Sequence, residues 1–272
     1  MSDAVAAVMG KTQQRAVTVT STTAFSAGWL VPRIGRFTAA NPGITLRIHP
    51  CETVVDLQRG VADCAIRYGG APFAGLVAEP LFDDSFAPIC SPGLNIRMPE
   101  DLKHHTLLHS EWRLQNEFTP SWRKWCKIAG VRDVDTRAGT VLTDESHVIQ
   151  ATIAGQGIAL LSTVLVQDEL RRGLLVQPFG PALEGLGYHF VFPKTATGNP
   201  GIRAVRDWLF QRNEHRRLGY GPIKLNGLSP GSLGRRHGCR SAWLASWAAE
   251  SDGPWRHHRP AIYGPIGRQS VR

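Results

Sequence analysis

Side chains that can bind a small charged molecule gather at a few points of this sequence. The first is the run Ser-Thr-Thr-Ala-Phe-Ser at residues 21–26, which directly follows a β-branched, apolar stretch. Where a helix begins, such hydroxyls and the free backbone N–H groups can surround a carboxylate. The same hydroxyls can instead serve only as helix caps. Thr22, Thr23 and Ser26 are therefore candidate ligand-binding residues, with capping as the alternative.

A second polar run, Thr-Asp-Glu-Ser at residues 143–146, opens another predicted helix. Its two acids are also favourable partners for the positive end of a helix dipole, and that is the simpler explanation. If Asp144 and Glu145 instead face a cleft, they suit an ammonium group. Thr143 and Ser146 then become candidate ligand-binding residues. A carboxylate at the first run and an amine at the second predict an amino-acid-like ligand.

Three further candidates end predicted strands. Arg67 and Tyr68 close the third strand, and His109 closes the fourth. Arg67 can anchor an acidic group of a ligand, or it can pair with a neighbouring acidic side chain. His109 fits a polar residue at the rim of a site better than a metal ligand.

Known catalytic and metal-binding motifs do not fit this sequence. Gly155 and Gly157 lie at the end of a predicted helix rather than after a strand, and a third glycine is missing, so they do not form a dinucleotide loop. The sequence contains neither a G-x-S-x-G elbow nor a Walker A motif. The histidine pairs at 104–105 and 257–258 lack cysteine or acidic partners at metal-ligand spacing. We predict no catalytic residue, no metal and no cofactor, and hence not an enzyme.

The composition is that of an ordinary globular protein, with 272 residues, 42% of them hydrophobic and 19% charged. No apolar run approaches the roughly 18 residues of a membrane helix. The first fifteen residues carry an acid at position 3 and no continuous apolar core, which does not match a secretory signal. The five cysteines form no C-x-x-C pair and are expected to be reduced. These features predict a cytoplasmic protein that does not enter a membrane.

The positive charge belongs to the C-terminal segment. Of the net charge of +9, residues 213–272 contribute +7, and the remaining residues are close to neutral. That segment also contains nine glycines and five prolines and shows no sustained apolar period, so we expect a disordered basic tail. A tail of this kind leaves open a protein that binds nucleic acid without regard to sequence.

The rest of the chain alternates strands and helices. Short connections between such elements favour right-handed crossovers and parallel sheets. An extended apolar stretch at residues 76–92 interrupts the alternation and predicts a crossover between two lobes. The predicted strands are 16–21, 44–49, 62–68, 106–110, 138–142, 158–161 and 188–192, and the predicted helices are 29–40, 53–59, 120–128, 145–156, 163–172 and 201–212.

We expect the first lobe to comprise residues 15–87 and 190–212, and the second lobe residues 88–189. A ligand of such a two-lobed protein binds between the lobes.

Four sequence segments in this order resemble a known family. They read WLVPRIGRF at 29–37 followed by Asn41-Pro42, DCAIRYG at 63–69, PLF at 80–82 with PICSP at 88–92, and AGQGIAL at 154–160. Together they span about residues 16–212 and resemble the effector-binding domain of LysR-type transcriptional regulators. The amino acids in these segments are most similar to those of the subgroup that contains the glycine cleavage operon activator and the β-lactamase gene activator.

The resemblance implies an α/β fold of the type 2 periplasmic-binding-protein kind. Each of its two lobes is a mainly parallel sheet flanked by helices, and two crossover strands join them. The implied role is to sense a small effector, amino-acid-like or a carboxylate, and so to control transcription. The family also implies a homodimer or homotetramer in which helix 30–40 packs on helix 148–156 of a partner. The candidate interface residues are Ile34, Phe37, Val148 and Ile149, with burial inside their own lobe as the alternative.

The family places a DNA-binding helix-turn-helix head before this domain. Here residues 1–14 resemble only the end of the helix that links head and domain, so we expect operator DNA to be bound only through a head that this sequence lacks. Two other functions stay open beside the regulator: an extracytoplasmic solute-binding receptor of the same fold, and the sequence-blind nucleic-acid binder noted above.

Overall fold

The structure is a computed structural model that describes residues 15–113 and 115–210. The expectations of a linker remnant at 1–14 and of a disordered tail at 213–272 fall outside these residues. Within them, no helix is both long enough and apolar enough to span a lipid bilayer.

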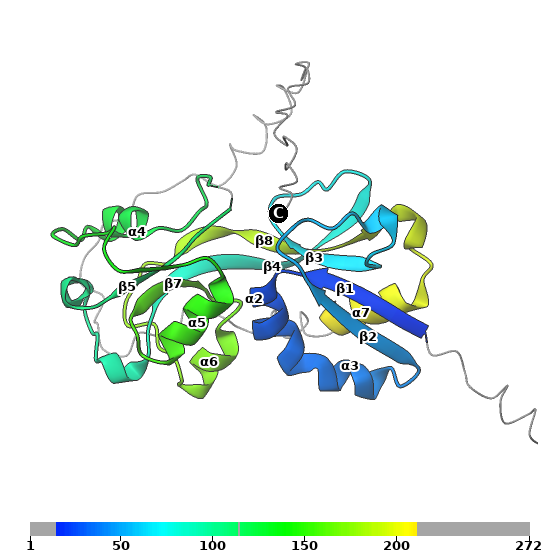
Figure 1. Ribbon diagram of the computed structural model, residues 1–272, viewed down its shortest axis with the longest axis horizontal. Coiled ribbons are helices and arrows are strands. Elements are labelled where there is room, and N and C mark those ends of the chain that lie inside the picture. Colours follow the sequence, from blue (N-terminus) through cyan, green and yellow to red (C-terminus); the bar gives the residue numbers. More distant parts are fainter. Residues whose placement is uncertain (1–14, 114, 211–272) are drawn as a thin grey trace, which may run out of the picture. The chain divides into compact units, whose positions relative to one another are not determined.

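An eight-stranded mixed sheet, in the order β2-β1-β3-β8-β4-β7-β5-β6, organises these residues (Figure 1). Parallel pairs join β1 to β2 and β3, and join β5 to β6 and β7. The two long strands β4 and β8 are antiparallel to each other and to their outer neighbours. The strands are β1 (Arg15–Ser21), β2 (Ile44–Pro50), β3 (Cys64–Tyr68), β4 (Leu76–Ile89), β5 (Leu107–Ser110), β6 (Thr140–Leu142), β7 (Ile158–Ser162) and β8 (Leu183–Pro193).

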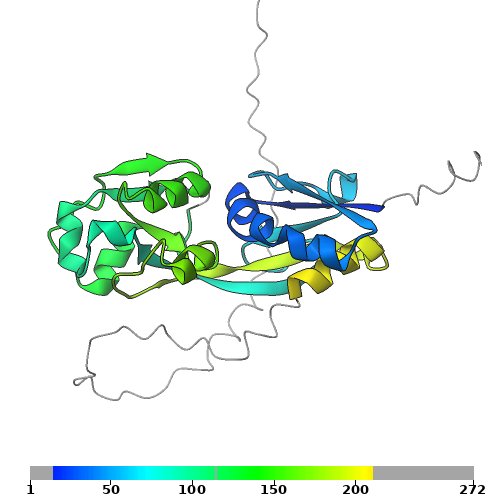
Figure 2. The same cartoon turned by 90° about the horizontal axis from the view of Figure 1, so that it is seen from below.

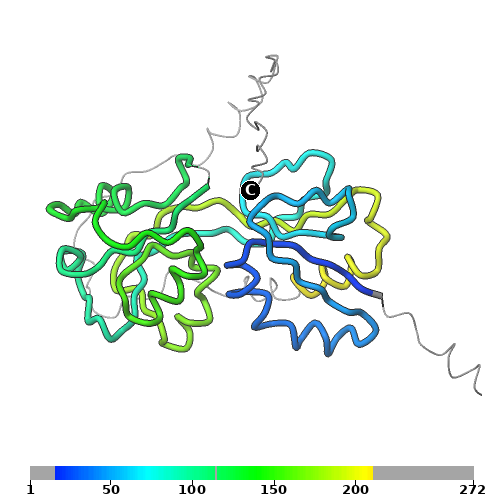
Figure 3. Tube along the Cα trace, viewed as in Figure 1, coloured from blue at the N-terminus to red at the C-terminus, as the bar shows by residue number. Residues whose placement is uncertain are grey.

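The chain passes from one group of elements to the other along β4 and returns along β8 (Figure 3). We call the group around β1, β2 and β3 the first lobe and the group around β5, β6 and β7 the second lobe. The expected lobe limits near residues 88 and 190 fall within β4 and β8, and they stay a prediction. The α/β fold class itself is confirmed by the solved structures reported below.

An unbroken helical segment runs through the first lobe and changes its hydrogen-bond pattern on the way. It consists of α2 (Thr23–Phe25), a π-helix (Ser26–Leu30), a 3-10 turn (Val31–Arg33) and α3 (Ile34–Ala40). Pro32 lies early in the 3-10 turn, where its missing N–H is tolerated. The segment contributes the buried side chains of Phe25, Trp29 and Phe37 to the core. It starts six residues before the helix predicted at 29–40. Helix α7 (Pro200–Phe210) packs beside it on the same lobe.

In the second lobe, each of the α-helices α4, α5 and α6 has at least one end that matches a capping signal in the sequence. Helix α4 (Trp122–Ala129) begins at Ser121, whose side chain accepts from Lys124 N–H, and ends at the left-handed Gly130. Helix α5 (Glu145–Ile153) has Asp144 as its N-cap, and α6 (Gln167–Arg172) ends at the left-handed Gly173. Figure 2 shows α5 and α6 next to the helical segment of the first lobe.

The main hydrophobic core is shared by both lobes. It includes Trp29 of the first lobe, Phe190 of β8, and Val148 and Leu161 of the second lobe. A smaller core under α4 is built around Trp122 and Trp125, among other residues. The two lobes therefore do not have separate interiors.

Two further predicted helices begin four residues later than expected. The helix expected at 53–59 is a single 3-10 turn, Leu57–Arg59, because only Asp56 and the left-handed Gly60 supply a start and a stop. The helix expected from residue 163 begins at Gln167. Residues 163–166 form a turn, with the Ser162 hydroxyl accepting from Leu165 N–H at 3.3 Å.

Candidate functional site

The beginning of α2 uses its hydroxyls for capping and also binds a carboxylate. Thr22 Oγ1 accepts from Phe25 N–H at 3.2 Å. The Ser26 and Ser21 hydroxyls are hydrogen-bonded to each other at 2.7 Å and are buried. The backbone N–H of Thr23 donates to Glu52 Oε1 at 2.7 Å. A carboxylate of the protein itself thus lies at the helix start, where the sequence predicts a ligand acid.

The beginning of α5 combines a capped end with a buried acid. Asp144 Oδ1 accepts from the backbone N–H and the hydroxyl of Ser146 at 2.8 and 2.6 Å. Thr143 is exposed between β6 and α5. Glu145 Oε1 is shielded from solvent and has no hydrogen-bond partner among the described residues. Burial, followed by the nearby Asp84 carboxylate, raises the pKa of Glu145 to about 8.

The crossover strands complete this group of polar residues. Asp84 on β4 is 6% exposed, and its Oδ1 accepts from Ser85 N–H at 2.8 Å and from the Ser162 hydroxyl at 2.9 Å. Tyr188 on β8 is buried near Asp84 and Glu145, and burial raises the pKa of its phenol well above the ordinary value. Polar groups from α5, β4, β7 and β8 therefore meet at one place in the sheet.

Tyr68 belongs to this group, and Arg67 does not. The Tyr68 hydroxyl accepts from Leu186 N–H at 2.8 Å, and its ring lies 5.0 Å from that of Tyr188. Because neighbouring residues of a strand point to opposite faces, Arg67 points away from Tyr68. Its Nη2 donates to the Val55 carbonyl at 2.8 Å, and its guanidinium lies 5.6 Å from the Phe73 ring centre.

His109 lies at the edge where β5 pairs with β6, and its Nε2 is hydrogen-bonded to the Ala138 carbonyl at 2.9 Å. Among residues 15–113 and 115–210, no group of histidine, cysteine and acidic side chains could hold a metal ion. The His109 side chain thus connects β5 to the turn that precedes β6.

The predicted residues are brought together only in part. Helix α2 packs against α5, and the charges of Glu52 and Glu145 are close enough to interact. The starts of the two helices thus lie near each other, with Tyr68 beside them. A pocket of about 400 Å³ opens at the start of β3, and one of about 270 Å³ lies between α3 and α6. None of the predicted ligand-binding residues lines either pocket, so convergence on one cavity stays a prediction.

Four residues of this polar group were missed by sequence reasoning: Glu52, Asp84, Ser162 and Tyr188. A signal did exist for Asp84, which lies within an extended apolar run. An acid at such a position is buried only when it has a partner, so a polar neighbour could have been expected. No local pattern marks Glu52, which reaches Thr23 from a loop 29 residues further along the chain.

Comparison with known proteins identifies the family. A sequence model described as the LysR substrate binding domain matches residues 10–214. The chain belongs to the LysR family. The glycine cleavage system transcriptional activator of Escherichia coli K12 is 31% identical over 218 residues, which cover 78% of this chain and 70% of that protein. The transcriptional activator AmpR of Rhodobacter capsulatus is 32% identical over 189 residues, covering 69% of this chain and 63% of that protein.

Solved LysR structures agree with the fold. The effector domain of AmpR from Pseudomonas aeruginosa matches with a TM-score of 0.61 and 28% identity, covering 75% of this chain and all of that one. The AmpR effector-binding domain of Citrobacter freundii matches with a TM-score of 0.60 and 26% identity, over 73% of this chain and 98% of that one. The chain is thus an effector-binding domain of a transcriptional regulator, and its relatives are regulators rather than enzymes.

Three of the four residues suggested for a LysR dimer interface are buried within this chain. Phe37 is fully buried, with its ring 5.3 Å from that of Trp208. Val148 and Ile149 belong to the main core. Burial in the same chain, the alternative considered for these residues, is what the structure shows for all three. Only Ile34 retains exposed surface.

Proposed function

We propose that this LysR domain binds a small metabolite with both a carboxylate and an ammonium group, between the starts of α2 and α5. One observation carries the proposal. Thr23 N–H already holds a carboxylate, that of Glu52, while the facing Glu145 keeps an unpartnered, buried carboxyl oxygen. The backbone N–H of Thr23 thus suits a bound anion, and the carboxyl group of Glu145 suits a bound cation.

The chemistry of each contact follows from these groups. The carboxylate of the metabolite would replace Glu52 at Thr23 N–H, with the Thr22 hydroxyl beside it, in a charge-assisted hydrogen bond. The ammonium group would donate to Glu145 and offset the Asp84 charge that disfavours ionisation of Glu145. Because an opposite charge favours the ionised form of an acid, Glu145 would lose its proton as the cation binds.

Such a ligand changes the regulator only if it prefers one arrangement of the two lobes to another. In our proposal the occupied domain acts as part of a cytoplasmic homodimer, and the contacts between the copies carry the change in arrangement to transcription. The partly exposed Ile34 is the one candidate interface residue that can take part.

The test compares three forms of one compound: an amino acid, the same acid without its amine, and the same amine without its acid. A ligand that binds only the folded state raises the unfolding temperature with its concentration. Among the twenty common amino acids and their D forms, at least one should raise the unfolding temperature of the full chain. Its two truncated forms should raise it much less.

Glu145→Gln should abolish the stabilisation by the amino acid, and the exposed Glu117→Gln should not. A panel without any stabilising amino acid, on protein that unfolds cooperatively, would refute the amino-acid-like effector. So would stabilisation that is the same in Glu145→Gln and in the wild type.

A further inference from the structure

A second place where both lobes contribute lies between α3 and α6, on residues that the effector site does not use. An open pocket of about 270 Å³ is lined there by Pro32, Arg33, Arg36, Asp168, Arg171 and Arg172. Four of these six residues are arginines, and one is an acid. The described body of the chain is nearly neutral, so this pocket concentrates positive charge.

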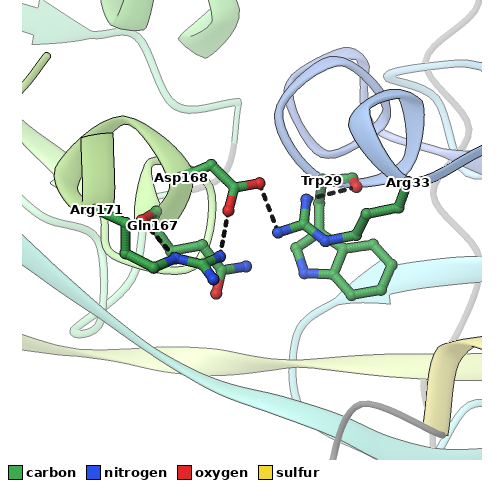
Figure 4. Close-up of polar contacts among 5 residues, drawn as sticks. All are labelled: Trp29, Arg33, Gln167, Asp168 and Arg171. Carbon is green, nitrogen blue, oxygen red and sulfur yellow. Dashed lines mark hydrogen bonds and ion pairs between the residues drawn. The ribbon is translucent and has the colours of Figure 1, made fainter.

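Arg33 lines the pocket, and its side chain is 4% exposed. Figure 4 shows its polar contacts. Its Nη1 donates to the Trp29 carbonyl at 2.9 Å, and its guanidinium lies 4.8 Å from the Trp29 ring centre. Its Nη2 pairs with Asp168 Oδ2 at 2.7 Å. When the Gln167 amide is oriented with its oxygen toward Trp29 and Arg33, that oxygen accepts from both. Arg33 is thus a preorganised cation that joins the two lobes.

The single acid does not balance the arginines. Asp168 pairs with Arg33 through one oxygen and with Arg171 through the other (Figure 4). Arg36 and Arg172 are exposed and form no ion pair with any residue that the structure describes. Burial lowers the pKa of Arg33, Asp168 opposes that effect, and the charges of Arg171 and Arg36 lower the pKa further. The pocket therefore holds mutually repelling cations that an anion would relieve.

The buried donors point the same way. Arg33 Nε is shielded from solvent and has no acceptor among the described residues. An unsatisfied buried donor in a native protein calls for an explanation, and a missing anion or water is a common one. Stabilisation of the α6 dipole explains Arg171 and Arg172, which lie in its last turn, but not Arg33 and Arg36 from another lobe.

We propose that this pocket is a second ligand site, for a phosphate-like dianion. Guanidinium groups match the oxygens of phosphate with paired, charge-assisted hydrogen bonds. A charge excess of several arginines suits a doubly charged anion better than a single carboxylate. The volume is several times the roughly 30 Å³ of a water molecule and lies below the roughly 300–1,000 Å³ of pockets for drug-sized ligands. It fits inorganic phosphate or the phosphate group of a larger compound.

The site is independent of the proposed effector site. A bound dianion would contact α3 of the first lobe and α6 of the second, and it would hold the two lobes together beside the Arg33–Asp168 pair. The expected consequence is a stabilised arrangement of the lobes whether or not an effector is present.

The test titrates the full chain with inorganic phosphate against chloride at constant ionic strength, with the unfolding temperature as readout. Phosphate should stabilise the wild type saturably. Arg36→Gln and Arg172→Gln should each weaken phosphate binding on the order of tenfold, as expected for one charge-assisted contact. Both residues are exposed, so both variants should fold. Arg47→Gln and Arg203→Gln remove exposed arginines elsewhere and should leave the phosphate affinity within about twofold of the wild type.

Each other outcome overturns the proposal. No saturable effect of phosphate on the wild type means that the pocket is not an anion site. An equal loss in the Arg47→Gln and Arg203→Gln controls means diffuse attraction to a basic protein. Acetate that binds as tightly as phosphate at equal concentration means a carboxylate site. If phosphate has no effect and Arg36→Gln alters the oligomeric state, the pocket is a contact between copies of the chain.

Discussion

At the scale of single residues, burial makes the ionisation of Glu145 and Arg33 depend on their neighbours. Glu145 lies against Asp84 and keeps its proton well above the usual pH for a glutamate. Arg33 is 4% exposed and keeps its charge because Asp168 lies 2.7 Å away. Replacing the buried Glu145 should raise the free energy of unfolding at high pH, whereas removing Asp168, the partner of the buried Arg33, should lower it.

The raised pKa of Glu145 predicts how stability depends on pH. A carboxyl whose pKa is about 8 when folded, against 4.5 as its ordinary value, binds its proton more tightly in the folded state. Folding stability from this group is therefore complete below pH 4.5 and is lost as the pH rises through 8. As the pH rises from 5 to 9, the unfolding free energy of Glu145→Gln should increase relative to that of the wild type, on the order of several kcal/mol. Urea unfolding at both pH values, with Glu117→Gln as control, measures this, and parallel pH profiles would contradict it.

Loss of the partner of Arg33 should be costly. Asp168→Asn leaves a buried guanidinium facing a neutral amide, for which we expect a loss of about 3–5 kcal/mol in unfolding free energy. Arg33→Met with Asp168→Asn should recover much of that loss, because no buried charge remains. The control is Asp207→Asn, since Asp207 is 63% exposed and lies 3.8 Å from Arg206. If Asp168→Asn and Asp207→Asn have the same free energy of unfolding in urea, the buried Arg33 does not depend on its ion pair with Asp168.

At the scale of elements, the helical segment 23–40 connects the two sites. Its first turn lies at Thr23 beside Glu52, and its third turn presents Arg33 to α6. Between them, the π-helix Ser26–Leu30 changes the register. Insertions of this kind are often found at functional positions in helices. The segment thus connects the proposed effector site with the contact between the lobes.

Two glycines of this segment offer a matched test of that contact. A Cβ at Gly28 would lie 2.9 Å from the Leu165 carbonyl oxygen, whereas a Cβ at Gly35 would meet nothing within 4 Å. Gly28→Ala should therefore force the helix away from the turn at 163–166 and cost about 1–3 kcal/mol. Gly35→Ala should be neutral or should stabilise by up to about 1 kcal/mol, because alanine favours helix. Equal effects of the two substitutions on urea unfolding would show that the close approach is absent.

The strands and most helices were predictable from the sequence because apolar periodicity and caps are local signals. The helix predicted to end at residue 172 does end there, with Gly173 in the left-handed conformation that closes it. The π-helix and the Glu52–Thr23 contact were not predictable, since both depend on packing between distant segments. The grouping of Arg67 and Tyr68 in one site was wrong for a different reason, because strand alternation, a local rule, sends them to opposite faces.

At the scale of the whole molecule, residues from both lobes belong to one hydrophobic core. We expect the chain to self-associate, as proposed above. Ile34→Asp should shift the protein toward monomers with little change in its unfolding temperature, because Ile34 is partly exposed. Phe37→Asp should instead unfold it, because Phe37 is fully buried. Light scattering over a range of concentrations distinguishes these outcomes. A wild type that is monomeric at every concentration would refute the dimer.

The central claim, that a LysR effector with an acid and an amine binds between the starts of α2 and α5, is tested most directly by a crystal structure with the most stabilising amino acid. We expect its carboxylate within hydrogen-bonding distance of Thr23 N–H, with the Glu52 side chain displaced. We expect its ammonium group against Glu145. An amino acid bound elsewhere, with the Glu52–Thr23 hydrogen bond intact and Glu145 Oε1 still without a hydrogen-bond partner, would contradict the account.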